Sequence, residues 1–73
     1  MSMNKISPKV LLHSKWTASV PVNREKHFAV TEVEFDEDKK VIRCVIQAVY
    51  SSNEYEINWR DLKQPSQWRQ GWC

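Results

Sequence analysis

Val-Ile-Arg-Cys-Val-Ile-Gln-Ala-Val-Tyr-Ser, at positions 41–51, carries the strongest secondary-structure pattern in the chain. Alternate residues of this run share one face of an extended chain, and those on one face are all apolar or aromatic: Ile42, Cys44, Ile46, Ala48 and Tyr50. This period of two, in a run rich in β-branched residues, predicts a β-strand. The run is longer than a typical strand, so we expect it to curl.

The flanking segments predict two more strands and so a three-strand meander. Residues 27–35 change the phase of their apolar alternation near Thr31, which predicts a β-bulge there. Residues 54–60 alternate cleanly, and three side chains are expected to face inward: Tyr55, Ile57 and Trp59. Short polar segments at residues 36–39 and 51–53 are expected to be the connecting turns.

The first part of the chain predicts one further strand and a short helix. Residues 15–20 alternate with Trp16 on the apolar face, and the following proline is expected to end the strand. Residues 21–26 are predicted to form a polar loop. Upstream, Ser7 and Pro8 are typical of a helix N-terminus, since serine can cap the first turn and proline suits its first position.

The tryptophans are expected to supply much of the core, because each indole buries a large apolar area and a 73-residue chain has little else to bury. Trp16 and Trp59 are predicted to be core residues. Trp68 and Trp72 lie four positions apart, so a helical turn would stack them on one face. A turn or short 3₁₀ helix is expected at residues 65–68, and at least one of these two indoles is expected to be half exposed.

These elements together predict a mainly-β fold with minor α content, in a single small domain over residues 1–73 with residues 1–6 disordered. Strands joined by short turns pair antiparallel, and so small a sheet must curl or be covered to bury a core. We expect a curled antiparallel sheet that forms a partly open barrel of the SH3-like kind, with a short N-terminal helix and an irregular or 3₁₀ tryptophan-rich tail. The alternative is a flat antiparallel sheet covered by that helix and the tail.

Composition argues against several functional classes. A single glycine leaves no phosphate-binding loop, and the histidines and cysteines do not have zinc-ligand spacing. We therefore expect no metal, no cofactor and no catalytic residue, and the protein is not predicted to be an enzyme. Thiol chemistry at Cys44 is the one exception considered, since a thiol beside a histidine can act as a nucleophile.

The chain carries no apolar run of membrane-spanning length and no signal-peptide core, and its two cysteines do not suggest a disulfide framework. A cytoplasmic protein with no membrane contact, present as a monomer or weak dimer, is the expectation. The net charge of +2 does not by itself indicate nucleic-acid binding. The charges are unevenly placed, however, because an acidic run at residues 32–38 separates two basic stretches.

Four motifs distributed along the chain are distinctive in combination: His-Ser-Lys-Trp-Thr-Ala at 13–18, Arg-Glu-Lys-His-Phe-Ala-Val at 24–30, Trp-Arg-Asp-Leu at 59–62 and Trp-Arg-Gln-Gly-Trp at 68–72. In these motifs the chain resembles a small bacterial family of tryptophan-rich conserved hypothetical proteins. The resemblance covers nearly the whole chain. It implies a free-standing bacterial protein of uncharacterised function, with no activity, cofactor or catalytic residue to carry over.

Basic and aromatic residues give the leading functional hypothesis, a small binding module for RNA or single-stranded nucleic acid. Cations beside exposed indoles suit such ligands, because bases stack on the rings and phosphates pair with the charges. The candidate residues for this patch are Lys15, Arg24, Lys26, His27, Arg60, Trp68, Arg69 and Trp72. Two alternatives stay open: the charges are simply solvated, or the protein is an interaction module or small regulatory subunit that uses its tryptophan-rich tail or an open strand edge.

Overall fold

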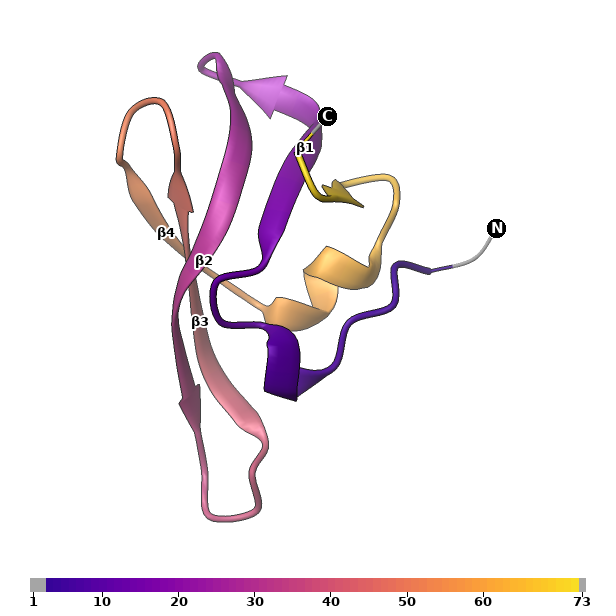
Figure 1. Cartoon of the computed structure of the whole chain (residues 1–73), viewed down its shortest axis with the longest axis vertical. Coiled ribbons are helices and arrows are strands. Elements are labelled where there is room, and N and C mark those ends of the chain that lie inside the picture. Colours follow the sequence, from indigo (N-terminus) through magenta and orange to yellow (C-terminus); the bar gives the residue numbers. More distant parts are fainter. Residues whose placement is uncertain (1–2, 73) are drawn as a thin grey trace.

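The computed structural model describes residues 3–72, and these form one antiparallel sheet of five strands in the order β4-β3-β2-β1-β5 (Figure 1). The strands are β1 (Lys15–Val22), β2 (Glu25–Phe35), β3 (Val41–Ala48), β4 (Glu54–Ile57) and β5 (Trp68–Gln70). Two 3₁₀ turns accompany them, η1 (Pro8–Val10) and η2 (Trp59–Lys63). The mainly-β prediction is confirmed.

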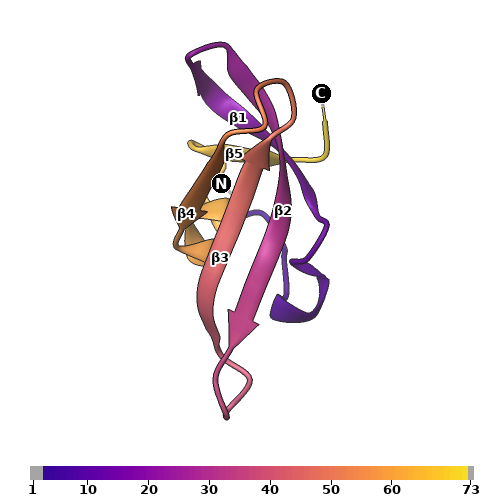
Figure 2. The same cartoon turned by 90° about the vertical axis from the view of Figure 1, so that its left-hand side faces the viewer.

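The sheet is an open one that bends around its core. Strands β1 to β4 form a meander, and β5 returns to pair with the other edge of β1. The long β2–β3 ribbon forms one side of the molecule, while η1, η2 and β5 lie on its other side (Figures 1 and 2). Within residues 3–72 no pairing joins β4 to β5, so the sheet remains unclosed at that point. The predicted small antiparallel sheet is confirmed, and within residues 3–72 it is not closed into a barrel.

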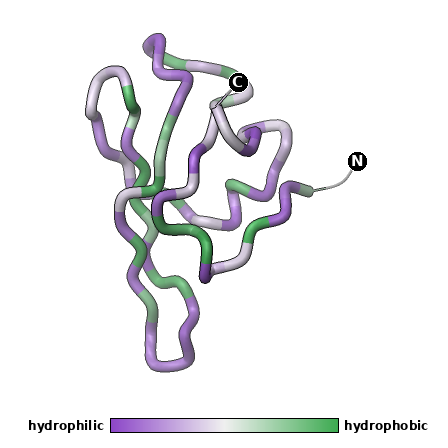
Figure 3. The backbone as a smooth tube through the Cα atoms, viewed as in Figure 1, coloured by the Kyte–Doolittle hydropathy of each residue, from purple (hydrophilic) through white to green (hydrophobic). Residues whose placement is uncertain are grey.

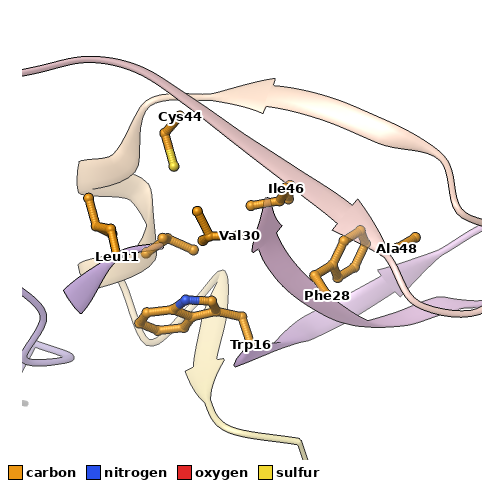
Figure 4. Close-up of a cluster of buried hydrophobic side chains, with 8 residues drawn as sticks. Leu11, Trp16, Phe28, Val30, Cys44, Ile46 and Ala48 are labelled. Atoms are coloured by element: carbon orange, nitrogen blue, oxygen red, sulfur yellow. The ribbon is translucent and has the colours of Figure 1, made fainter. Parts of the chain in front are cut away.

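The core lies between the β2–β3 ribbon and the two 3₁₀ turns, where Figure 3 shows hydrophobic segments of the chain gathering. Its buried members are Leu11, Trp16, Phe28, Val30, Cys44, Ile46, Ala48 and Leu62. Figure 4 shows Leu11, Trp16, Val30 and Cys44 pointing toward one another. The indole N–H of Trp16 donates to the Ser14 hydroxyl at 2.8 Å, so the buried ring carries no unpaired polar group.

The predicted bulge in β2 is confirmed. Pairing passes from Val30–Ile46 to Glu32–Val45, which leaves Thr31 as the extra residue. An extra residue changes which face the following side chains occupy. For this reason the two ends of β2 can both send apolar side chains toward the core.

The predicted apolar face of residues 41–51 is correct only in its middle. Ile42 is 62% exposed and Tyr50 is 88% exposed. Tyr50 lies beyond the end of β3, in the turn to β4. A second register shift between β2 and β3 lies at this point, between the pairs Glu34–Arg43 and Phe35–Val41. As a result, Val41 rather than Ile42 packs against the core.

The loop predicted at residues 21–26 is wrong, because β1 continues to Val22 and β2 begins at Glu25. Asn23 and Arg24 form a two-residue hairpin turn with φ angles of 56° and 63°. Positive φ at both positions is the geometry that matches the twist of paired strands. Pro21 stays within β1 because β5 does not extend along this part of the strand.

The predicted N-terminal helix is a single 3₁₀ turn, with Pro8 at its start as expected. Ser7 makes no side-chain capping hydrogen bond. Residues 1–6 were predicted to be disordered, and of these residues 1–2 lie outside the described part, as does residue 73 at the other end. The Asn4 backbone N–H donates to the Lys63 carbonyl at 2.8 Å, and its side-chain amide donates to the Trp68 carbonyl at 2.7 Å.

The C-terminal region also differs from expectation. The strand predicted to reach residue 60 ends at Ile57, because the Asn58 side chain accepts the backbone N–H of Arg60 at 3.0 Å and begins η2. Trp59 is therefore in η2, where it packs partly buried against the core. Trp68 lies in strand β5, so the predicted helical stacking of Trp68 and Trp72 is wrong.

Candidate functional site

Three of the predicted basic site residues lie on the face of the sheet that points away from the core. Because Trp16 points inward, its neighbours in β1 are directed to the opposite face of the sheet. On that face Thr17 is itself buried, and its hydroxyl donates to the Gly71 carbonyl at 2.7 Å. Thr17 pairs with His27 on one side and with Arg69 on the other, and directly paired residues share a face. Lys15 is two residues from Thr17 and lies on the same face.

Trp72 completes this group. After β5, Gly71 adopts a φ of 78°, which favours glycine, and its N–H donates to the Lys15 carbonyl at 2.8 Å. The indole N–H of Trp72 then donates to the Phe28 carbonyl at 3.0 Å. The Lys15 ammonium lies 4.6 Å from the centre of the indole, and the His27 ring centre lies 6.1 Å away. We call Lys15, His27, Arg69 and Trp72 the outer patch.

The other four predicted residues lie elsewhere. Lys26 precedes His27 in β2 and so is directed to the opposite side of the strand, while Arg24 is at the tip of the hairpin. Arg60, on η2, lines a separate hollow with Arg43. Trp68 points inward, and its ring meets Phe28 edge-on at 5.1 Å. The predicted tryptophan pair therefore divides between the two faces of the sheet.

A cluster around Arg43 occupies another part of the outward face. Its guanidinium lies 2.8 Å from the Glu32 carboxylate, 4.0 Å from Glu34 and 3.7 Å from Glu56. Glu32 first, and then the other two carboxylates, raise the pKa of Arg43 above its ordinary value. Three acids around one base leave this region negative, so the outward face has an acidic part and the basic outer patch.

A hydrogen-bonded carboxylate, that of Glu25, was not foreseen from the sequence. The residue is only 5% exposed. Its carboxylate accepts hydrogen bonds from the Tyr55 hydroxyl at 2.5 Å, from the Asn53 amide at 3.1 Å and from the Ser51 hydroxyl. These bonds tie the β1–β2 hairpin to the β3–β4 connection. Between Arg24 and Lys26, Glu25 looked like a solvated loop charge, and no local pattern marks its partners.

The family described as Tryptophan-rich protein (DUF2389) matches residues 14–73, a span that includes all five strands and all four tryptophans. The chain belongs to this family. The predicted resemblance is thereby confirmed, and the family is one of unknown function. No curated protein and no solved structure matches the chain.

The whole outer patch and the Glu25 network of this tryptophan-rich protein lie inside the matched span.

Among residues 3–72, no helix is long and apolar enough to cross a membrane. In the same part of the chain, no three side chains of the His, Cys, Asp or Glu type are grouped as a metal site would require.

The Glu25 network predicts a specific pH dependence of stability. Hydrogen bonds from Ser51, and then from Tyr55, lower the pKa of Glu25 below its ordinary value in the folded state. The resulting stabilisation is complete at neutral pH and is lost as the pH falls from the ordinary glutamate value through the lowered one. Urea unfolding of the wild type and of Glu25→Gln at pH 7 and at about pH 3 measures this contribution. The wild type should be more stable than the variant at pH 7, with a smaller difference at low pH, and a pH-independent difference would contradict the expectation.

Cys44, the exception considered for thiol chemistry, is fully buried in the core. Burial raises the pKa of this thiol to about 11. Since the thiolate is the reactive form, the environment of Cys44 disfavours nucleophilic chemistry at neutral pH. The geometry around this residue is that of a packed side chain.

Proposed function

We propose that this protein binds single-stranded nucleic acid through the outer patch. The observation that carries the proposal is Trp72: an indole that is 45% exposed, anchored to β2 by its N–H and placed beside Lys15 and His27. An anchored ring loses little conformational freedom when a base stacks on it. Stacking of this kind tolerates any base, so the expected binding is weakly selective for sequence.

The cations of the patch supply the second half of the interaction. The Lys15 ammonium lies over the indole in the free protein. A base that stacks on this face displaces the ammonium, which then pairs with a phosphate. Arg69 is exposed on the neighbouring strand β5 and can contact the next phosphate along the strand. RNA and single-stranded DNA are both ligands under this proposal, because flexible single strands of either kind present unstacked bases.

Titration of the labelled protein with short random-sequence RNA and DNA at low salt tests the proposal. Amide signals of Lys15, His27 and Arg69 and the indole N–H signal of Trp72 should shift together. The affinity should fall with added salt. If two cations contact phosphates, a plot of the logarithm of the binding constant against the logarithm of the salt concentration should have a slope of about −1.4 for single strands. No binding to either nucleic acid at low salt would contradict the proposal.

A matched pair of arginine variants separates the outer patch from a general charge effect. Arg69→Gln and Arg60→Gln each remove one exposed positive charge, but only Arg69 belongs to the patch. The first variant should weaken binding and reduce the salt slope, while the second should leave the slope unchanged. Equal losses in the two variants would mean that net charge, rather than this surface, determines the affinity.

The proposal also includes a cytoplasmic location and a monomeric binding module. Cys44 is a free thiol, as is usual for proteins of a reducing compartment. The outer patch is formed entirely by one chain, so nucleic-acid binding does not require a second copy.

A further inference from the structure

An apolar groove lies at the opening of the sheet, away from the outer patch. Its volume is about 630 Å³, within the range of ligand-binding clefts. Val20 and Val22 of β1, Tyr55 and Ile57 of β4, and Trp68 of β5 contribute to its lining. Val20 is 74% exposed and Val22 is 65% exposed. Apolar side chains that are grouped together and this exposed are typical of a contact surface.

Strand edges without a partner border this groove. β4 is the last strand of the sheet and pairs only with β3, while β5 pairs with β1 only as far as Ala18. The Ala48 N–H donates to the carbonyl of Asn53 at 2.8 Å. Because bonded and non-bonded pairs alternate in an antiparallel ladder, the backbone N–H and C=O groups of Glu54 and Glu56 are directed away from β3. These groups are available to an added strand.

The charge of this edge selects the kind of occupant. Glu25 and Glu56 are the charged residues that line the groove, and no lysine or arginine of the described residues lines it. Glu54 lies on β4 two residues before Glu56 and is exposed. Every salt bridge among residues 3–72 involves Arg43, so Glu54 has no cationic partner there. A positively charged occupant is therefore complementary to the edge.

We propose that the groove binds an extended peptide in which apolar and basic side chains alternate, added as a strand beside β4. The alternation follows from the sheet itself. Tyr55 and Ile57 line the groove and pair with Ile46 and Cys44 of the core face. Glu54 and Glu56 pair with Gln47 and Val45 of the outward face, although Glu56 also borders the groove. A strand beside β4 thus places every second side chain in the apolar groove and the others next to carboxylates. Backbone hydrogen bonds supply affinity and the side chains supply selectivity, as in other strand additions.

A second copy of this chain is a poorer occupant of the same edge. If β4 paired with β4 of another molecule, Glu54 and Glu56 would face the same acidic side chains. Like charges directly opposite one another destabilise a strand pair. The acidic edge therefore disfavours self-association and favours a basic partner.

Three capped synthetic peptides, each about six residues long like a typical strand, test the proposal with the full chain. In the first, valine and lysine alternate; in the second, valine and glutamate alternate; the third is the first with proline at a central position. The first should shift the backbone amide signals of Glu54 and Glu56. The glutamate peptide should bind at least about tenfold more weakly because of like-charge repulsion. The proline peptide should also bind more weakly, because it cannot complete the hydrogen-bonded ladder.

Charge reversal on the protein gives the sharpest control. Glu54→Lys should reverse the preference between the lysine and glutamate peptides, while Glu37→Lys, at an exposed turn position, should not. Arg69→Gln in the outer patch should leave peptide binding unchanged, which separates this proposal from nucleic-acid binding. Equal binding of all three peptides, no shift on β4, or the same effect of both charge reversals would overturn the proposal. Shifts on β4 that depend on protein concentration alone would also overturn it, in favour of a second copy.

Discussion

Replacing Trp16 with alanine is expected to leave the protein largely unfolded at room temperature. The side chain is 1% exposed and belongs to the buried core cluster. Truncating a fully buried tryptophan costs about 3–5 kcal/mol, through lost apolar burial and the cavity left behind. A domain of this size is stabilised by only a few kcal/mol in total, so the loss is comparable with the whole free energy of unfolding.

Urea unfolding followed by far-ultraviolet circular dichroism measures this effect, and Trp72→Ala is its matched control. Trp72 is 45% exposed, so its truncation removes less apolar burial and one hydrogen bond to the Phe28 carbonyl. The hydrogen bond is worth about 1 kcal/mol, and this variant should remain folded with a lower midpoint. A cooperative transition of Trp16→Ala near that of Trp72→Ala would show that the core does not depend on this indole.

The parts of the fold that the sequence predicts well are those decided by neighbouring residues. Alternation over residues 41–51 identifies a strand and the inward position of Cys44 and Ile46, because a strand repeats every two residues wherever it lies. The change of phase near Thr31 likewise predicts the bulge. Trp16 is correctly placed in the core by its size and its position in an alternating run.

The parts that were missed depend on pairings between distant segments. The Asn23–Arg24 turn is tight because β1 and β2 pair up to that point, and nothing in a polar stretch indicates how far strands continue. The Glu25 carboxylate finds its hydrogen-bond donors in and around the β3–β4 connection, far along the sequence. Local composition does not encode such contacts.

The candidate site illustrates the same limit. Lys15, His27, Arg69 and Trp72 were all predicted as binding residues, but the sequence could not separate them from the remaining candidates. Their grouping requires β5 to return to β1, and Trp72 to cross to β2 after Gly71. The division of Trp68 and Trp72 between two faces follows from β5 being a strand rather than a helical turn.

Leu11→Ala is expected to produce the second large loss of stability. Of the three apolar residues at positions 10–12, only Leu11 is buried, at 0% exposed, whereas Val10 and Leu12 are exposed. Truncating a buried leucine costs about 2–5 kcal/mol. A three-residue 3₁₀ turn has little stability of its own, so η1 depends on this side chain for its attachment.

Leu12→Ala is the matched control, because the neighbouring leucine is 48% exposed and its truncation should cost less than about 0.5 kcal/mol. Hydrogen exchange distinguishes local detachment of η1 from global destabilisation. The His13 N–H donates to the Val30 carbonyl, and the Val30 N–H donates to the Ser14 carbonyl, so both amides report on this attachment. Leu11 packs in the same core as β2 and β3. In Leu11→Ala the backbone amides that pair β2 with β3 should therefore exchange faster by the same factor as the amides of His13 and Val30. Faster exchange at His13 and Val30 alone would mean that residues 14–73, the span of the family match, fold without the segment that precedes them.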